Sequence, residues 1–250
     1  MAPANGDSVS GNQLAATYAD KIKDKIILVT GTSQGSLGEE YCLAIAKFQP
    51  KILILAGRSA DKVKFMSDTI AKIDSKIATK FLELNLESLS AVKKAAETVN
   101  HWDDVPYIDV FCHNAAIMGT IHGVTTDGFE RQLGVNYLAT WVFTNNILPK
   151  ILKLQDPRVV LLGSDGHRLG PIRWHDHNFK VSDLTFITLQ GNYKIDFELG
   201  NEEAANGWPK YRSKEAGIVT SVYASFDPNL GHPAKSRPIS YGSGLKSSST

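Results

Sequence analysis

The chain has 250 residues, of which 42% are hydrophobic and 21% are charged, and this composition is close to the globular average. It excludes collagen-like, coiled-coil and wholly disordered proteins, and the net charge of +1 gives no reason to expect a nucleic acid or an anionic membrane as partner. No apolar run approaches the roughly 20 residues of a membrane span, the N-terminus is unlike a signal peptide, and Cys42 and Cys112 lie in apolar runs. We therefore expect a soluble, cytoplasmic protein without a membrane span, in which both cysteines are buried free thiols.

Short apolar runs alternate with helical patterns along the first two thirds of the chain. Residues 1–20 are polar and small, so we expect a flexible lead-in there. Runs rich in β-branched residues predict buried strands at 25–29, 51–56, 81–84, 108–112 and 158–162. Apolar residues spaced three and four apart predict helices at 37–48, 61–73, 88–99 and 128–152. This alternation predicts an α/β fold, a doubly wound, mostly parallel sheet of Rossmann type with helices on both faces.

The regular pattern ends after Gly163. Residues 184–189 resemble a strand, and residues 208–225 hold either one helix or a short helix followed by a strand at 218–222. From Asp227 the chain is rich in Pro, Gly, Ser and Lys, and we expect a disordered tail over 227–250. The predicted organisation is therefore one dinucleotide-binding and catalytic domain over residues 21–226, between the flexible lead-in and the disordered tail.

A glycine-rich turn joins the first predicted strand to the first helix. Residues 30–38 read TGTSQGSLG. Glycine permits positive φ and close approach of a ligand, and the N-terminus of the following helix attracts a diphosphate. A glycine-rich loop can also bind nothing, but at this position in a doubly wound sheet it predicts a dinucleotide site.

The end of the second predicted strand indicates which dinucleotide is bound. Residues 55–59 read LAGRS, without the carboxylate that would bind the adenosine ribose of NAD. Arg58 could form a bidentate pair with a 2′-phosphate, and this favours NADP(H). The alternative interpretation is a solvated arginine at the start of a helix.

These features make the sequence resemble the short-chain dehydrogenase/reductase family over about residues 20–180. The glycine turn resembles its cofactor loop, HNAA at 113–116 resembles its segment beside the nicotinamide ribose, and FERQLGVN at 129–136 is similar to the retinol-dehydrogenase-like branch and its fungal relatives. The resemblance implies an NADP(H)-dependent oxidoreductase that interconverts a carbonyl and a secondary alcohol on a small organic substrate. Members of the family often pair through the long helix, so the resemblance is compatible with a homodimer, and Trp141 and Phe143 on this helix are expected to be either packing or dimer-contact residues.

The resemblance assigns roles to individual residues. Tyr211 would be the acid/base and Lys214 would lower its pKa. Ser164 would orient the substrate carbonyl, and Asn136 would hold a water in the proton relay. The coenzyme would contact Gly31, Thr32, Ser33, Gln34, Gly35, Leu37, Gly38, Arg58, Asn85, Leu86, Asn114, Ala115, Ala116 and Lys214.

The C-terminal third departs from the family pattern. Tyr211 and Lys214 are three residues apart and not four, which turns one by about 100° relative to the other on a helix. The 36 residues after Lys214 lack the expected sixth strand and substrate-covering helices. The alternatives are a catalytically impaired nucleotide-binding relative and a chain too short to fold stably. We hypothesise that altered splicing, a frameshift or a misread gene produced this third.

Three histidines, His167, His175 and His177, lie near Asp176. They lack a second cluster with the spacing of metal ligands, and the segment resembles a loop. We therefore interpret them as surface histidines and predict no metal.

Overall fold

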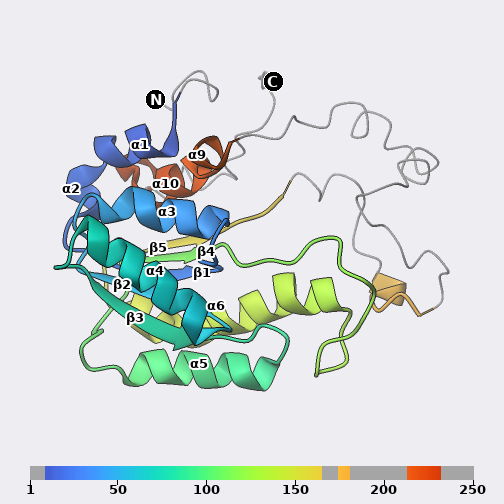
Figure 1. Cartoon of the computed structure of the whole chain (residues 1–250). Helices are drawn as coiled ribbons and strands as arrows, with labels where there is room; N and C mark the ends of the chain where they lie inside the picture. The colour runs from blue at the N-terminus through green and yellow to red at the C-terminus, as the bar shows by residue number, and fades with distance from the viewer. Residues whose placement is uncertain (1–8, 165–173, 181–212, 232–250) are drawn as a thin grey trace, which may run out of the picture.

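The computed structural model describes residues 9–164, 174–180 and 213–231. At its centre lies a parallel sheet of five strands in the order β3-β2-β1-β4-β5 (Figure 1). The strands are β1 (Ile26–Thr30), β2 (Ile52–Gly57), β3 (Ala78–Glu83), β4 (Val110–His113) and β5 (Arg158–Leu161). All five predicted strands are confirmed. Strand β3 begins at Ala78, three residues earlier than predicted. The apolar pattern missed its first half because the side chains there are exposed or partly exposed and form no apolar run.

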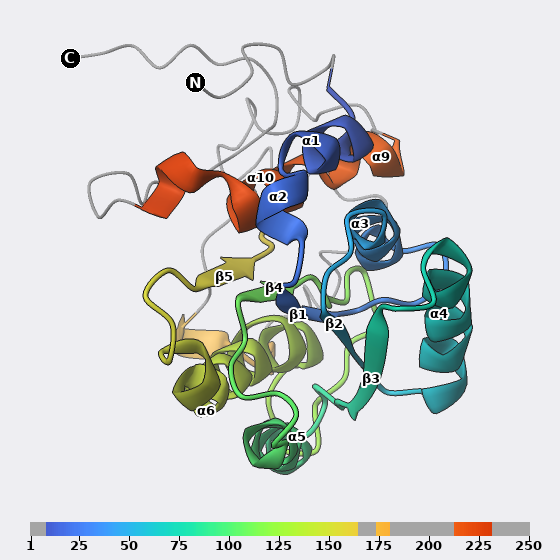
Figure 2. The same ribbon diagram turned by 90° about the vertical axis from the view of Figure 1, so that its left-hand side faces the viewer.

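Helices cover both faces of the sheet (Figure 2). The helices on one face are α1 (Gly11–Thr17), α3 (Leu37–Ala46), α4 (Ala60–Ile73), α9 (Lys214–Gly217) and α10 (Val219–Phe226). On the other face lie α5 (Leu89–His101), the π-helix η1 (Leu133–Ala139) and α6 (Thr140–Ile151). Alternate strand residues enter the two cores, so that Ile27 and Val29 pack on one side of β1 while Ile26 and Leu28 pack on the other. The predicted α/β class is confirmed, and both cysteines are buried and free as expected.

The N-terminal segment differs from the prediction of a flexible lead-in. Residues 11–22 form α1 and α2 (Ala19–Ile22), and a capping box between Ser10 and Gln13 starts α1. Leu14 and Ala15 are buried, and the Tyr18 hydroxyl donates to Asp227 at 2.7 Å. The prediction was wrong for residues 11–20 because these contacts are made with the far end of the chain.

The C-terminal segment is also more ordered than predicted. Residues 218–222 belong to a helical segment and do not form the alternative strand, because Ile218, Val222 and Phe226 recur at helical spacing and enter the core. The tail prediction is wrong for residues 227–231, where Asp227 is buried and η4 (Pro228–Gly231) is a short 3-10 helix. The predicted strand at 184–189 and the tail from residue 232 lie outside the described residues.

The long helix predicted for 128–152 is divided and starts later. The Glu130 carboxylate accepts hydrogen bonds from the backbone N–H groups of Gln132 and Leu133 at 2.9 and 2.7 Å, and η1 begins there and leads into α6. A further short element, η3 (Trp174–Asp176), is a 3-10 helix. In the described part of the chain, no helix is long and apolar enough to span a bilayer.

Candidate functional site

A cavity of about 410 Å³ lies at the carboxyl ends of β1, β2, β3 and β4. Strand order reverses between β1 and β4, and open α/β sheets bind ligands at such a reversal. The lining residues come from the last residues of β1 and β2, from the turns that follow the four strands, from the first residue of α3 and from η1: Thr30, Gly31, Ser33, Ser36, Leu37, Ala56, Gly57, Arg58, Leu84, Asn85, Leu86, Glu87, Asn114, Ala115, Ala116, Ile117 and Val135. The fold therefore builds one site from segments that are far apart in the sequence.

The turn between β1 and α3 needs glycine because backbone segments meet there. A Cβ on Gly31, whose φ is +73°, would lie 2.8 Å from the Ala115 Cα, and one on Gly38 would lie 2.4 Å from the Gly31 carbonyl oxygen. Ser36 caps α3, since its hydroxyl oxygen accepts from the Glu39 N–H at 3.1 Å and its O–H donates to the Gly31 carbonyl at 2.9 Å. The N-terminus of this ten-residue helix thus adjoins the cavity and favours an anion there.

One amide of this turn already has an anionic partner. The Gly35 N–H donates to the carboxylate of Glu39, which lies in the first turn of α3. Gly35 has a φ of +82°, and a Cβ there would meet no atom within 4 Å. An anion that used the Gly35 amide would have to displace Glu39, a competition that the glycine pattern alone did not predict.

Asn114 joins the ends of β1 and β4. Its side-chain amide donates to the carbonyl oxygens of Thr30 and Gly31 at 3.2 and 3.0 Å. The Thr30 hydroxyl oxygen accepts from the backbone N–H groups of Asn114 and Ala115 at 3.1 and 2.9 Å. These four hydrogen bonds fix the two turns on either side of the sheet's reversal point.

A buried histidine extends this network to η1. The His113 Nδ1 atom lies 3.2 Å from the Thr30 hydroxyl, and Nε2 lies 2.8 Å from the Thr140 hydroxyl. Because Thr140 donates its proton to the Asn136 carbonyl at 2.9 Å, we assign the imidazole proton to Nε2, which donates to Thr140. Burial lowers the pKa of His113 to about 4, so the ring is neutral near pH 7.

Asn136 holds the wall of the cavity in place. Its side-chain oxygen accepts from the Ile117 N–H at 2.9 Å, and its amide group donates to the Ile117 carbonyl at 2.8 Å. Asn136 lies within η1, and π-helical segments are frequent at functional sites. The structure therefore gives this residue a positioning contact with the segment beside the cavity.

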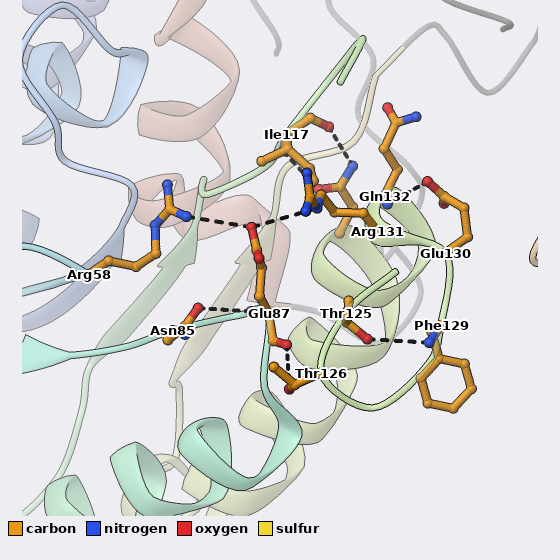
Figure 3. A network of polar contacts seen from close by, with 11 residues as sticks. Arg58, Asn85, Glu87, Ile117, Thr125, Thr126, Phe129, Glu130, Arg131 and Gln132 are labelled. Carbon is orange, nitrogen blue, oxygen red and sulfur yellow. Dashed lines mark hydrogen bonds and ion pairs between the residues drawn. The ribbon is translucent and has the colours of Figure 1, made fainter. Parts of the chain in front are cut away.

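A charged network lies at the rim of the cavity (Figure 3). Glu87, from the turn between β3 and α5, places Oε1 3.6 Å from Arg58 Nη1 and 4.0 Å from Arg131 Nε. The backbone of Glu87 is fixed, since its N–H donates to Asn85 and its carbonyl accepts from the Thr126 hydroxyl. The sequence showed no carboxylate after β2, but the parallel neighbour β3 ends beside it and supplies one.

The residues expected to contact a coenzyme fall into two groups. Nine of them line the cavity: Gly31, Ser33, Leu37, Arg58, Asn85, Leu86, Asn114, Ala115 and Ala116. The other five, Thr32, Gln34, Gly35, Gly38 and Lys214, do not line the cavity. All of them except Lys214 belong to the glycine-rich segment 30–38, which does contribute other residues to the lining. The sequence did not single out Glu87, Ile117 or Val135, and only Glu87 left a signal, its position in the turn that follows a neighbouring strand.

Three of the four residues expected to act on a substrate, Asn136, Ser164 and Lys214, lie within the described residues. Ser164 is exposed beyond the end of β5, and Tyr211 lies outside the described residues. Lys214 is exposed at the start of α9, on the sheet face opposite to η1 and Asn136. The structure thus assembles the nucleotide-sized cavity, but it separates Lys214 from Asn136. In the described ranges, no group of three His, Cys, Asp or Glu side chains could hold a metal ion.

Comparisons with known proteins agree with this geometry. A sequence profile for the family described as short chain dehydrogenase matches residues 25–175. The chain is 32% identical over 160 residues to retinol dehydrogenase 13 of Mus musculus, a match that covers 64% of this chain and 47% of that protein. It is 30% identical over 227 residues to the short-chain dehydrogenase/reductase prx1 of Penicillium roqueforti, covering 84% of this chain and 62% of that protein. The chain thus spans about half to three fifths of the length of these relatives.

A solved structure shares the fold. It is a crystal structure from Escherichia coli CFT073, described as a short chain dehydrogenase complexed with NADPH. The TM-score is 0.57 at 20% sequence identity, and the match covers 84% of this chain and 93% of that one. This likeness supports the arrangement of strands and helices.

Proposed function

The chain belongs to the short-chain dehydrogenase family, and from this premise we propose that it is an NADP(H)-dependent oxidoreductase. It would interconvert a carbonyl and a secondary alcohol on a small organic substrate. Members of the family use nicotinamide coenzymes, and the retinol dehydrogenase among the relatives is named for an alcohol substrate. The observation that carries the proposal is the cavity at the reversal point of the sheet, bordered by a glycine turn, a helix N-terminus and Arg58.

The residues of the cavity fit the chemistry of NADP(H). The glycine turn and the start of α3 offer backbone N–H groups for the diphosphate, and the Arg58 guanidinium suits a 2′-phosphate. Asn85 and Leu86 would border the adenine, and Asn114, Ala115 and Ala116 would border the nicotinamide ribose. The open space at Gly35 is consistent with a ligand approaching the turn, provided that Glu39 releases the Gly35 amide.

The bound coenzyme would supply or accept the hydride. In the proposed mechanism, Tyr211 exchanges a proton through its hydroxyl with the substrate oxygen, and the Lys214 cation lowers the pKa of that hydroxyl. Ser164 donates a hydrogen bond to the same oxygen, where negative charge develops. Asn136 positions the segment around Ile117 at the cavity wall.

A second candidate function is a nucleotide-binding relative with impaired catalysis. The three-residue spacing of Tyr211 and Lys214 and the place of Lys214 on the face opposite to Asn136 favour it. A displacement of a catalytic group by even about 1 Å can cost roughly 100-fold in rate. This candidate keeps the coenzyme cavity and loses proton transfer.

Titration of the full chain with NADPH, followed by turnover assays on a panel of ketones and secondary alcohols, tests both candidates. Arg58→Gln should weaken NADPH binding about tenfold and change NADH binding less, because only NADPH carries the 2′-phosphate. Binding with turnover supports the oxidoreductase, and binding without turnover supports the second candidate. One residue inserted between Tyr211 and Lys214 should then restore turnover, whereas no binding of either coenzyme contradicts both.

A further inference from the structure

We propose that Glu87 and Arg131 determine the coenzyme preference of this site. Glu87 competes with the 2′-phosphate for Arg58, and Arg131 competes with Arg58 for Glu87. This inference rests on the proposed function and assigns a role to two residues outside the glycine turn. In this role Glu87 opposes the phosphorylated coenzyme, and Arg131 weakens that opposition by offering Glu87 another partner.

The first observation is the position of the Glu87 carboxylate. Glu87 and Arg58 both line the cavity, and their charged groups lie 3.6 Å apart (Figure 3). A 2′-phosphate that binds Arg58 must therefore replace a carboxylate or lie beside it. Two like charges at such a distance repel, so Glu87 disfavours NADP(H) while it stays on Arg58.

The second observation is an unused donor on Arg131. Its Nε atom is buried and has no hydrogen-bond partner within the described residues. Among the described residues, the carboxylate oxygen that pairs with this atom is again Glu87 Oε1, at 4.0 Å. A shift of about 1 Å would turn this contact into a hydrogen bond and satisfy a buried donor, which is costly to leave unpaired.

The third observation shows which parts can move. The backbone of Glu87 is held by Asn85 and Thr126, and that of Arg131 by the Gly123 carbonyl at 2.9 Å. The Arg58 side chain is 67% exposed and the Glu87 side chain 32% exposed, so both can change rotamer without disturbing the core. When NADP(H) binds, Arg58 would thus exchange its ion pair with Glu87 for one with the 2′-phosphate, and Glu87 would form a hydrogen bond with Arg131.

Binding measurements on single and double variants of the full chain test this exchange. NADPH, NADH, adenosine 2′,5′-bisphosphate and AMP are titrated by calorimetry into the unmodified chain and into Glu87→Gln, Arg131→Met and the double variant. Glu87→Gln should raise the affinity for the two 2′-phosphorylated ligands about three- to fivefold and leave NADH and AMP within about twofold, as expected for an exposed ion pair. Arg131→Met should lower the affinity for NADPH about two- to threefold, because Glu87 then has only Arg58, and this loss should vanish in the double variant.

Glu83→Gln is the matched control, since it removes an equal charge from an exposed position on β3 outside the cavity lining. The proposal is overturned if Glu87→Gln leaves the ratio of NADPH to NADH affinity unchanged or acts no differently from Glu83→Gln. It is also overturned if Arg131→Met lowers the affinity for NADPH by the same factor in the Glu87→Gln background as in the unmodified chain. If Arg58→Gln still lowers NADPH affinity in that case, the proposed function stands, whereas an unmodified chain that binds neither coenzyme refutes the proposed function as well.

Discussion

At the scale of single residues, Glu39 places a negative charge where a diphosphate would bind. Its carboxylate accepts the Gly35 N–H, one of the amides that the glycine turn offers to an anion. Glu39→Gln keeps the Ser36 cap, which uses only the Glu39 backbone, and removes the charge. We expect NADH and NADPH to bind about three- to tenfold more tightly, because both carry the diphosphate.

Fluorescence titration with the two coenzymes measures this effect. Glu40→Gln is the control, since Glu40 lies in the same helical turn and, among the described residues, only its backbone N–H and not its carboxylate bonds to the glycine loop. An increase confined to NADPH would contradict the prediction, because the diphosphate is common to both coenzymes.

His113 makes stability depend on pH. Burial lowers its pKa from 6.5 to about 4, so below pH 6.5 the unfolded chain binds a proton that the folded chain does not. Its stabilising contribution is therefore complete above pH 6.5 and is lost as the pH falls towards 4, by about 3 kcal/mol if the ring stays neutral in the fold.

Urea unfolding of the unmodified chain and of His113→Gln between pH 7.5 and pH 4 measures this loss. At pH 7 the variant should be less stable by about 1–2 kcal/mol, because the bonds to Thr30 and Thr140 are disturbed. The stability gap should close as the pH falls and reverse near pH 4, since glutamine does not titrate and the expected loss of about 3 kcal/mol exceeds the gap at pH 7. A gap that stays constant over this range would refute the low pKa.

At the scale of elements, the sequence predicted the strands and helices that are determined by a local pattern of apolar residues and glycines. The β1–α3–β2 unit follows from two apolar runs, one helical period and the glycines of the turn between them. Glu39, only four residues beyond Gly35, and Glu87, in the turn after a neighbouring strand, were missed because their roles depend on hydrogen bonds and strand adjacency that a linear pattern does not encode. Helix α1 was missed because its partners, such as Ile218, lie about 200 residues away.

The packing of α1 on the C-terminal helices can be tested at Gly11. A Cβ there would lie 2.2 Å from the Ile218 Cγ1 atom and 3.0 Å from the Glu215 carbonyl oxygen. Gly11→Val should therefore destabilise the fold by about 1–3 kcal/mol through overpacking. Ile218→Ala alone should also lower the free energy of unfolding, because it opens a cavity. In the double variant, chemical denaturation should show a smaller loss than the sum of the two single losses, because the smaller side chain makes room for Val at position 11. Strictly additive effects would mean that α1 does not pack on Ile218.

At the scale of the whole molecule, α1 and α2 pack into the same core as α3, so the ordered unit begins before the predicted boundary at residue 21. The other end of the fold presents apolar side chains to solvent. Tyr137 and Trp141, four residues apart on η1 and α6, are 51% and 61% exposed, while Phe143 of the same helix is fully buried. Of the two residues considered for a dimer contact, only Trp141 is exposed enough to make one, and Phe143 packs in the core.

A second apolar segment adjoins this helix. Met118 and Ile121 are 66% and 76% exposed, and the loop that carries them is tied to η1 by the Ile117–Asn136 bonds and by the Gly119 N–H donating to Gln132. Several large apolar side chains exposed on linked segments are typical of protein–protein contacts. We predict a homodimer in which this surface is covered and Trp141 is a central contact.

Trp141→Glu should convert the dimer to a monomer, because it places a charge in the apolar contact. Sedimentation velocity over a range of protein concentrations measures the change. Phe65→Glu is the matched control, since Phe65 is an aromatic residue 45% exposed on α4, on the other face of the sheet. If both variants sediment like the unmodified chain, the α6 surface is not the contact. Because Asn136 is the neighbour of Tyr137 on η1 and bonds Ile117, loss of the dimer should also loosen the wall around Ile117 and weaken coenzyme binding in parallel.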